Sequence, residues 1–480
     1  MPRRGTFPGA RVISSFQGNE RLTAFLYKSM VILLRVGALR PQVPFLRSSF
    51  RHLRQTMATS SAQVKPTVGI LSIGDMGMGV ARLLRHHDHT VYTVAVGRRQ
   101  VPLTQVHLQE HLRQMAKLSC DKSQHTLDRI KSSQITALPS DEALVAEADI
   151  ILSIVPPRDA VATARRAVEA CRSQTAIKRR SERSGTEALS QAPSLTYIDL
   201  NAISPRTTRS IAAMFSTPMS PSSPRRLSIS RTFTFQKKDK DPEPELEPIH
   251  VNFLDGGIIG GPPSLRPDKT WKRPSIVISG PNHASVLPEE LISLLNIQVL
   301  SDKIGAASAL KSCFASLTKG MTALSILSFT TAHTCGVLPA LQAHLEQFSP
   351  NTLALARGGL TGMPPKAYRW VDEMRQINET FVDEGGFSQP ILSAHAGTNG
   401  NGGGGSGGGG STGGIFDGIA DIYRLIADDT VLGQERVEKR KRGTSSEDVA
   451  ECVKEGIAKK KKKRVGSDGD LELAWRGNWS

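Results

Sequence analysis

A glycine-rich turn between two short apolar runs limits the possible folds more than any other feature of this sequence. Residues 68–73 are typical of a buried strand, residues 76–86 carry apolar side chains at helical spacing, and residues 90–96 form a second strand pattern. A strand, a helix and a strand in this order predict a β–α–β unit with parallel strands.

The strand patterns continue along the first part of the chain. Apolar runs recur at residues 148–155, 195–200, 255–263 and 275–279. Strands that alternate with helices favour a doubly wound parallel sheet. From about residue 283 the apolar spacing becomes helical, so the predicted fold class is α/β, with a doubly wound parallel Rossmann sheet followed by an all-α C-terminal domain.

Three segments of the second part have strong helical patterns. Residues 304–329 are apolar and carry no charge except Lys311 and Lys319, so we expect a helix buried in a domain core or at a subunit interface. Residues 366–384 are amphipathic, and residues 415–432 predict a last helix. These apolar helices lead us to expect a homodimer.

The predicted organisation has four parts, separated by changes in composition. They are a transit-like or disordered extension at 1–62, a Rossmann domain at 66–281 with disordered insertions near 176–193 and 216–248, an all-α domain at 282–434 with a Gly-rich loop at 397–414, and a disordered basic tail at 435–480.

The net charge of +17 does not by itself predict a nucleic-acid-binding function. The excess of Lys and Arg falls in residues 1–54, 176–248 and 435–480, whereas a binding domain concentrates charge on a folded face. Residues 1–62 resemble either a mitochondrial transit peptide or an extension upstream of Met57. We therefore expect a cytoplasmic or mitochondrial protein, and the basic runs in the tail make a nuclear location the less favoured alternative.

Cysteine and histidine spacing predicts neither disulfides nor a metal site. The five cysteines are dispersed without CxxC spacing, which favours a reducing compartment. The histidines at 86–89 follow a predicted helix without a second group of ligands, so we expect no metal there. No apolar run reaches about 18 residues, and we expect no membrane association.

The turn Ser72–Gly77 stands where a dinucleotide would bind. Gly74 has no side chain to block a pyrophosphate, Gly77 lets the helix approach the strand, and Asp75 and Met76 lie between them. The free N–H groups of the helix N-terminus attract phosphate. Because Ser72 occupies the place of the first glycine, and Ser prefers a negative φ, we expect a slightly altered turn.

The end of the second strand indicates which dinucleotide binds. An acid there would favour NAD, but Arg98 and Arg99 follow the strand instead, and a guanidinium suits a 2′-phosphate. The sequence favours NADP over NAD, and solvated surface arginines are the alternative interpretation.

Five motifs in chain order resemble the β-hydroxyacid dehydrogenase and 6-phosphogluconate dehydrogenase superfamily. They are the turn at 72–77, the loop at Val155 and Pro156, the segments 199–205 and 255–261, and the segment 305–311 that ends in Lys311. Residues 307–320 and 415–421 are similar to a sub-branch of phosphogluconate-dehydrogenase-like proteins with their own helical C-terminal domain. The resemblance implies that Val155 and Pro156 lie under the nicotinamide, and that Asn201, Gly260 and Gly261 bind the substrate.

The resemblance also implies that Lys311 is the catalytic residue. A lysine in an apolar setting can take the hydroxyl proton of a hydroxy acid during oxidation, because burial favours its neutral form. Lys319 lies about two turns further along the helix and can share a face with Lys311. A lysine exposed at the helix surface is the alternative.

Three polar positions of the family pattern are altered. Ile259 and Asn201 stand where the family has serines, and Ala315 stands where it has an asparagine. The function that we expect is therefore an NADP-dependent oxidoreductase acting on a small hydroxy acid or sugar acid. The alternatives are an NADP-binding sensor or scaffold without dehydrogenase activity, and an imine or ketone reductase.

Overall fold

The computed structural model describes residues 65–94, 126–184, 193–216, 246–388, 414–435 and 440–467. The predictions for residues 1–62, for Arg98 and Arg99, and for most of 216–248 and 397–414 lie outside these ranges. No helix in the described ranges is long and apolar enough to cross a membrane.

An eight-stranded sheet forms the first part of the described chain. Its order is β10-β9-β6-β5-β4-β1-β2-β3. The strands are β1 (Val68–Leu71), β2 (Val91–Val94), β3 (Thr136–Leu138), β4 (Ile150–Ser153), β5 (Leu195–Asp199), β6 (Val251–Ile259), β9 (Ser275–Ser279) and β10 (Ile297–Ser301). The predicted doubly wound sheet is confirmed, because the chain reverses its direction of travel between β1 and β4.

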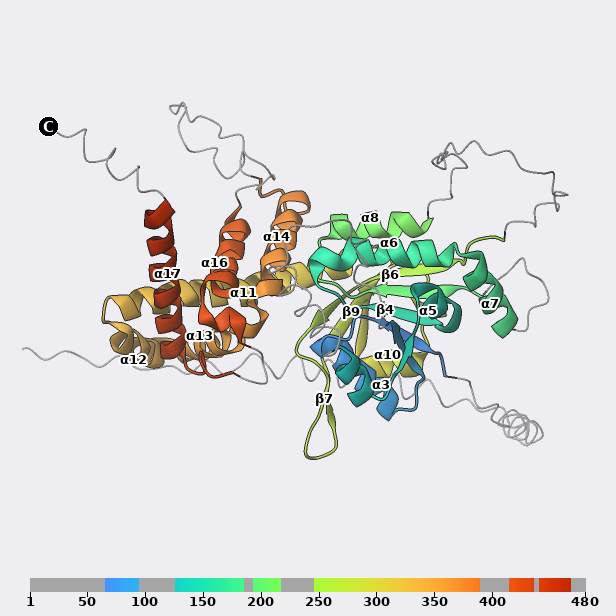
Figure 1. Ribbon diagram of the computed structural model, residues 1–480, viewed down its shortest axis with the longest axis horizontal. Coiled ribbons are helices and arrows are strands. Elements are labelled where there is room, and N and C mark those ends of the chain that lie inside the picture. The colour runs from blue at the N-terminus through green and yellow to red at the C-terminus, as the bar shows by residue number, and fades with distance from the viewer. Residues whose placement is uncertain are drawn as a thin grey trace, which may run out of the picture. The chain divides into compact units, whose positions relative to one another are not determined.

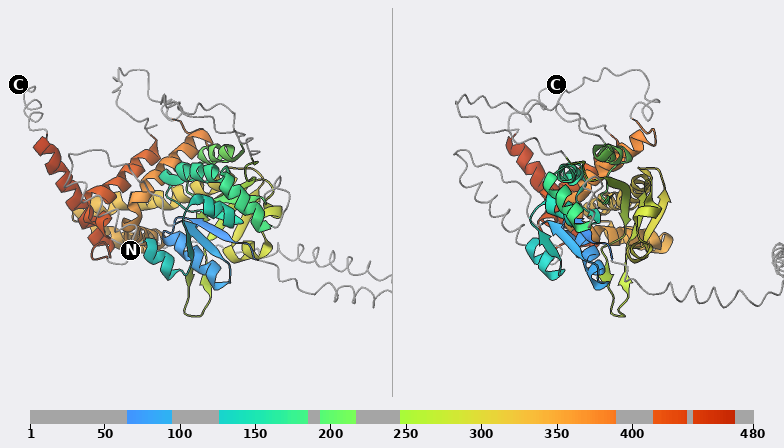
Figure 2. Two further views of the ribbon diagram at one scale, coloured as in Figure 1. Left: turned by 45° about the vertical axis from the view of Figure 1, so that its right-hand side comes forward. Right: turned by 90° about the vertical axis from the view of Figure 1, so that its right-hand side faces the viewer.

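One pair of strands differs from the parallel prediction. β6 pairs antiparallel with β9, whereas the other pairs in the sheet are parallel. The short connection from β6 to β9 explains this, since it holds only a hairpin, β7 (Ser264–Leu265) and β8 (Trp271–Lys272), and no crossover helix. The hairpin projects away from the sheet (Figure 2).

Helices cover both faces of the sheet (Figure 1). One apolar cluster is buried by four helices: α5 (Asp141–Glu147), α6 (Ala160–Cys171), α7 (Gln174–Ser184) and α8 (Pro205–Ser216). Another is buried by α3 (Asp75–His86) and α10 (Glu289–Leu295). The short helices η1 (Pro157–Asp159) and α9 (His283–Val286) lie in connections. Burial on both faces explains why β1 and β4 are continuously apolar.

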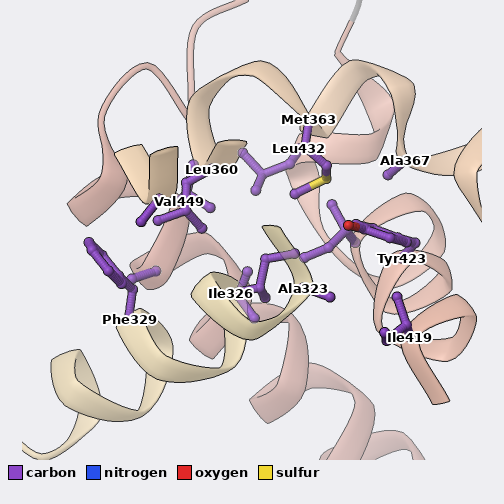
Figure 3. Packing of buried hydrophobic residues seen from close by; sticks show 14 of the residues in the cluster. Ala323, Ile326, Phe329, Leu360, Met363, Ala367, Ile419, Tyr423, Leu432 and Val449 are labelled. Atoms are coloured by element: carbon purple, nitrogen blue, oxygen red, sulfur yellow. The ribbon is translucent and has the colours of Figure 1, made fainter. Parts of the chain in front are cut away.

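The helical part contains the predicted apolar helix and its neighbours. Its elements are α11 (Ala306–Thr334), α12 (Leu338–Phe348), α13 (Pro350–Gly362), η2 (Pro364–Lys366), α14 (Ala367–Asp383), α16 (Ile415–Asp429), η3 (Val431–Gln434) and α17 (Ser446–Ser467). Figure 3 shows how Ile326 and Phe329 of α11 share one core with Tyr423 of α16 and Val449 of α17. The predicted all-α C-terminal part is thus confirmed as a fold.

The predicted domain boundary at 281/282 is too early. β10 lies beyond it and pairs with β9, so the sheet extends to Ser301 before α11 begins. The prediction missed β10 because only one of its five residues is buried, which leaves no apolar run to detect.

The predicted disordered tail is wrong over residues 446–467, which form α17. The side chains of Val449, Ala450, Cys452 and Val453 are buried in the helical core. The many lysines and arginines around these four residues conceal the short apolar face in the sequence.

The predicted disordered insertion near 176–193 is wrong up to residue 184, because α7 occupies it. Arg180 is fully buried, and its guanidinium donates to the carbonyls of Val145, Ala148, Pro193 and Ser194. A buried cation bonded to four carbonyls holds α7 against α5 and the start of β5. Composition alone could not indicate this, since arginine is normally exposed.

Candidate active site

The glycine-rich turn joins the carboxyl end of β1 to α3. Ser72 adopts a left-handed conformation with φ of 78°, so a serine takes the backbone conformation for which glycine is preferred. A Cβ on Gly77 would lie 2.3 Å from the Ser72 carbonyl oxygen, which explains the need for glycine there. The tight turn is therefore retained at Ser72.

Gly74 is the N-cap residue of α3 and differs from Gly77. Its φ is −72°, no side chain caps the helix there, and a Cβ at Gly74 would meet no atom within 4 Å. Open space in front of uncapped N–H groups at a helix N-terminus is suited to a phosphate. This space lies at the β1–β4 reversal of the sheet, where ligands of this fold class bind.

The two residues between these glycines have different surroundings. Met76 is partly buried and packs against the core of the sheet domain. Asp75 lies in the first turn of α3, and its carboxylate accepts a hydrogen bond of 2.6 Å from Arg129. The arginine offsets the negative charge that Asp75 places beside the uncapped N–H groups of α3.

Val155 and Pro156 follow β4 and lie beside the glycine-rich turn. Ile154 donates its N–H to the carbonyl of Leu71, and Val155 donates its N–H to Asn201 Oδ1 at 2.7 Å. The loop after β4 is therefore held at the carboxyl edge of the sheet, beside the glycine-rich turn.

Asn201 is a structural bridge between two loops. Only 2% of the residue is exposed, and its amide also donates to Ser153 Oγ at 3.0 Å. An amide that is buried and bonded in this way positions the loop after β4. Its role in binding substrate remains a prediction. The contacts described above do not favour that role, because they occupy the amide.

Gly260 and Gly261 are exposed and follow β6. Gly260 has φ of 121°, and a Cβ on Gly261 would meet no atom within 4 Å. The next two residues, Pro262 and Pro263, lie against Gly79 of α3. The segment therefore runs from the end of β6 to the helix that begins at the glycine-rich turn.

Asp255 of β6 anchors the N-terminus of α11. Its carboxylate, fully buried, accepts hydrogen bonds from the N–H groups of Gly305, Ala307 and Ser308 at 2.9–3.1 Å, and from the hydroxyls of Ser279 and Ser308. A carboxylate at a helix N-terminus satisfies donors that have no partner within the helix. Asp255 thus fixes where α11 begins on the sheet, and therefore also the position of Lys311 on that helix.

Asp199 lies beside Asp255 on the adjacent strand β5. Burial, together with the charge of Asp255, raises the pKa of Asp199 to about 7, although the N–H that Asn201 donates lowers it. Two adjacent buried carboxyls cannot both carry a charge cheaply, so the fold favours a proton on Asp199.

Lys311 lies directly over β6. A Cβ on Gly257 would come within 2.8 Å of Lys311 Cβ, so the missing side chain lets α11 approach the strand at this position. The Lys311 side chain is 16% exposed, and its Nζ lies 3.8 Å from Glu373 Oε1 of α14. Lys311 therefore faces the interior, as predicted.

Lys319 shares the same carboxylate. Its Nζ pairs with Glu373 Oε1 and lies 4.9 Å from the centre of the Trp370 ring. Burial lowers the pKa of Lys319 to about 8, although Glu373 raises it. Burial would raise the pKa of Glu373, but Lys319 and Lys311 together hold it below its usual value. The expectation that Lys319 shares a face with Lys311 agrees with this geometry.

Lys366 and Arg369, at the start of α14, interact electrostatically with charged groups of the site. Burial and the charge of Arg369 lower the pKa of Lys366, and Asp75 raises it. Arg369 also lowers the pKa of Lys319 and of Glu373. The start of α14 is therefore electrostatically coupled both to Asp75 and to the lysine pair.

The loop after β5 is also bound to α14. Ser204 donates its N–H to Gln376 at 2.9 Å and its hydroxyl to Glu379 at 2.7 Å. This loop carries Asn201, so contacts with one helix position the loop as well as Glu373.

Five residues of this site were not predicted from the sequence; they are Glu373, Trp370, Lys366, Arg369 and Arg129. Glu373 had a detectable signal, because it is an acid within the buried stripe of an amphipathic helix that includes Met374 and Ile377. Arg129 and Lys366 had none, because their spacing from the turn follows from tertiary packing.

Neither a metal-ligand group nor either of two surface hollows lies at this site in the described residues. The described residues contain no group of three His, Cys, Asp or Glu side chains that could hold a metal ion. Two surface hollows lie elsewhere, one between α5 and α7 and one between α16 and α17.

A family model matches part of the chain. Residues 332–426 match a domain of unknown function, DUF1932. The matched segment runs from the end of α11 into α16 and includes Glu373. No curated protein sequence matches the chain.

Several solved structures are similar to the chain. A 3-hydroxyisobutyrate dehydrogenase from Mycobacterium tuberculosis is 13% identical, with a TM-score of 0.44 over 81% of this chain and 98% of that one. A conserved protein of unknown function, described as structurally similar to 3-hydroxyacid dehydrogenases, is 20% identical, with a TM-score of 0.41 over 75% and 97%. An imine reductase from Myxococcus stipitatus in complex with NADP⁺ is 13% identical, with a TM-score of 0.36 over 69% and 95%.

Proposed function

We propose that this chain, which has a doubly wound sheet followed by helices and carries a DUF1932 domain at residues 332–426, is a nicotinamide-dependent oxidoreductase of the β-hydroxyacid dehydrogenase type. The observation that carries the proposal is the open space at Gly74, in front of the uncapped N-terminus of α3. Gly77, Val155 and Pro156 support it from the same edge of the sheet.

The residues of the turn suit a dinucleotide. The N–H groups of α3 would bind the pyrophosphate, and the loop at Val155 would support the nicotinamide. When bound, the dinucleotide supplies hydride transfer. We assign a preference for NADP to Arg98 and Arg99, because a guanidinium binds a 2′-phosphate through two parallel hydrogen bonds.

Lys311 is the residue that we assign to proton transfer. In the oxidation of a small hydroxy acid or sugar acid, the hydroxyl O–H bond breaks and an N–H bond forms on Lys311 Nζ. The carbinol carbon becomes a carbonyl as its hydride leaves for the oxidised dinucleotide. The position of Lys311 over β6 and its low exposure support this role, because the side chain lies in the interior beside the strand that leads to Gly260 and Gly261.

A turnover screen tests the function. The full chain is incubated with NADP⁺ or NAD⁺ and a panel of small hydroxy acids and sugar acids, and with NADPH or NADH and a panel of imines and ketones. Change in nicotinamide absorbance with a hydroxy acid supports the proposal. Turnover of imines alone would favour a reductase, and cofactor binding without any turnover would favour a sensor or scaffold.

We further propose that two copies of the chain associate through α11. Five large apolar side chains of α11 are 41–77% exposed and recur at heptad-like spacing along one face; they are Leu310, Phe314, Leu317, Leu324 and Leu327. A surface with this much exposed apolar area usually binds another protein. Both charges of α11 point inward, so the exposed face is uncharged and suits an identical face across a two-fold axis.

Replacing both Leu317 and Leu324 with Glu should convert the dimer to a monomer, because four carboxylates would then meet in one apolar interface. Light scattering after size-exclusion chromatography measures the mass. Leu355→Glu is the matched control, since Leu355 is equally exposed but lies on α13. A wild-type chain that is monomeric at micromolar concentration contradicts the proposal.

A further inference from the structure

Lys311 and Lys319 are unusual because both approach one oxygen atom. Eight residues separate them, a rise of about 12 Å along a helix. Their side chains nevertheless converge on Glu373 Oε1, which lies 3.8 Å from Lys311 Nζ and pairs directly with Lys319 Nζ. The carboxylate of α14 therefore lies between the two nitrogen atoms.

The group is buried. The exposed fractions of the Lys311, Lys319 and Glu373 side chains are 16%, 11% and 9%. Trp370 covers Lys319, and the hydroxyl of Tyr423 is occupied because it donates to the Lys319 carbonyl at 2.5 Å. Water has little access, so the charges interact more strongly than they would at the surface.

The charges in this group do not balance. Glu373 carries one negative charge, while Lys311 and Lys319 of α11 and Arg369 of α14 can carry three positive charges. Tyr423 of α16 is neutral, since burial raises its pKa far above its usual value. Two ammonium groups on one buried carboxylate repel each other, and the loss of one proton removes that repulsion.

We propose that Lys311 and Lys319 act as a coupled pair that holds one proton between them, with Glu373 as the bridge and Lys319 as a positioning residue for Lys311. The inference rests on the proposed function. Before the reaction the pair carries one ammonium and one amine, and the shared proton lies on Lys319 when Lys311 accepts the proton of the substrate. When the hydroxyl O–H bond of the substrate breaks, the proton forms an N–H bond on Lys311, and Glu373 stays ionised between the two lysines.

The pair explains how a lysine beside a carboxylate can serve as a base. Glu373 alone would stabilise the ammonium form of its partner lysine. The positive charge of Lys319 offsets this effect, and it does so within a buried group whose geometry three helices hold. Lys319 then matters for the chemistry although it lies behind Lys311.

The test follows the protonation of Lys319 in the full chain by NMR with ¹³C-labelled lysine side chains, the signal being assigned through Lys319→Arg. In the wild type we expect a midpoint near pH 8. Lys311→Met removes a like charge and should raise the midpoint by about one pH unit. Glu373→Gln removes the opposite charge and should lower it by about one unit or more.

The opposite directions separate coupling from a structural role. Both variants disturb the buried group, but disturbance alone would not move the midpoint up in one and down in the other. Lys303→Met is the control, because Lys303 is exposed in the segment just before the same helix and its replacement should leave the midpoint unchanged. A Lys319 midpoint near that of free lysine, or one that Lys311→Met leaves in place, overturns the inference.

Turnover provides a second readout. With an active substrate, Lys319→Met should move the acidic limb of the kcat profile for oxidation up by about one pH unit, because the positive charge that offsets Glu373 is lost, whereas a structural role would lower kcat equally at all pH values. If no substrate turns over while the two opposite NMR shifts are found, the proposed function fails and the coupled pair stands. If turnover is found without the NMR shifts, the coupled pair fails and the proposed function stands.

Discussion

Lys311→Met should reduce kcat by roughly 10³-fold on any substrate found in the turnover screen, while the affinity for NADPH changes by less than about 2-fold. The reason is that Lys311 Nζ is assigned to the hydroxyl proton, and Lys311 lies over β6 rather than at the glycine-rich turn. Met retains most of the side-chain volume and removes the amine, so α11 should stay packed on Gly257.

Three measurements on the Lys311→Met protein define this result. Steady-state rates give kcat, nicotinamide fluorescence gives the affinity for NADPH, and circular dichroism reports the fold. Lys303→Met serves as the control, because Lys303 is exposed just before α11. A Lys311→Met protein that retains more than a tenth of the wild-type kcat would show that another group takes the proton.

Asp255→Ala should lower the free energy of unfolding by about 3–5 kcal/mol. The substitution removes a buried carboxylate and leaves the N–H groups of Gly305, Ala307 and Ser308 without their acceptor at the start of α11. Because these bonds also fix where α11 begins, turnover should fall together with stability.

Urea denaturation of the Asp255→Ala protein measures the stability change. The control is Asp302→Ala, which removes a carboxylate that is 81% exposed and pairs with His283 at the surface. An exposed pair contributes at most about 1 kcal/mol. Similar losses for the two variants would show that Asp255 does not anchor α11.

Local patterns explain why much of the fold was predictable. β1, β4, β5 and β9 are buried on both faces, so their apolar runs end close to where the strands end. α14 was predicted within a residue at each end because its amphipathic stripe is regular. The glycine-rich turn was predictable because it depends on neighbouring residues only.

The remaining features depend on contacts between distant segments. The antiparallel pairing of β6 with β9, the burial of Arg180 and the packing of α17 each need a partner that no local pattern identifies. The same is true of the bridge between Lys311 and Lys319. Their common face follows from helical spacing, but the acid between them comes from a helix more than fifty residues further along the chain.

The central claim is that a nicotinamide dinucleotide binds at the turn after β1. Gly74→Val tests it with little harm to the fold, because φ at Gly74 is −72° and the new Cβ meets no atom within 4 Å. The cost of placing Val at this N-cap is about 1 kcal/mol. Gly418→Val is the matched control, since a Cβ at Gly418 of α16 also meets nothing.

The measurement is a titration of the full chain with NADPH and with NADH, followed by nicotinamide fluorescence. We expect the wild type and Gly418→Val to bind NADPH more tightly than NADH. We also expect that Gly74→Val, still folded, binds NADPH at least ~10-fold more weakly, because the valine side chain occupies the position of the pyrophosphate. Equal binding by Gly74→Val and wild type, or no binding of either nucleotide by the wild type, would contradict dinucleotide binding at the turn after β1.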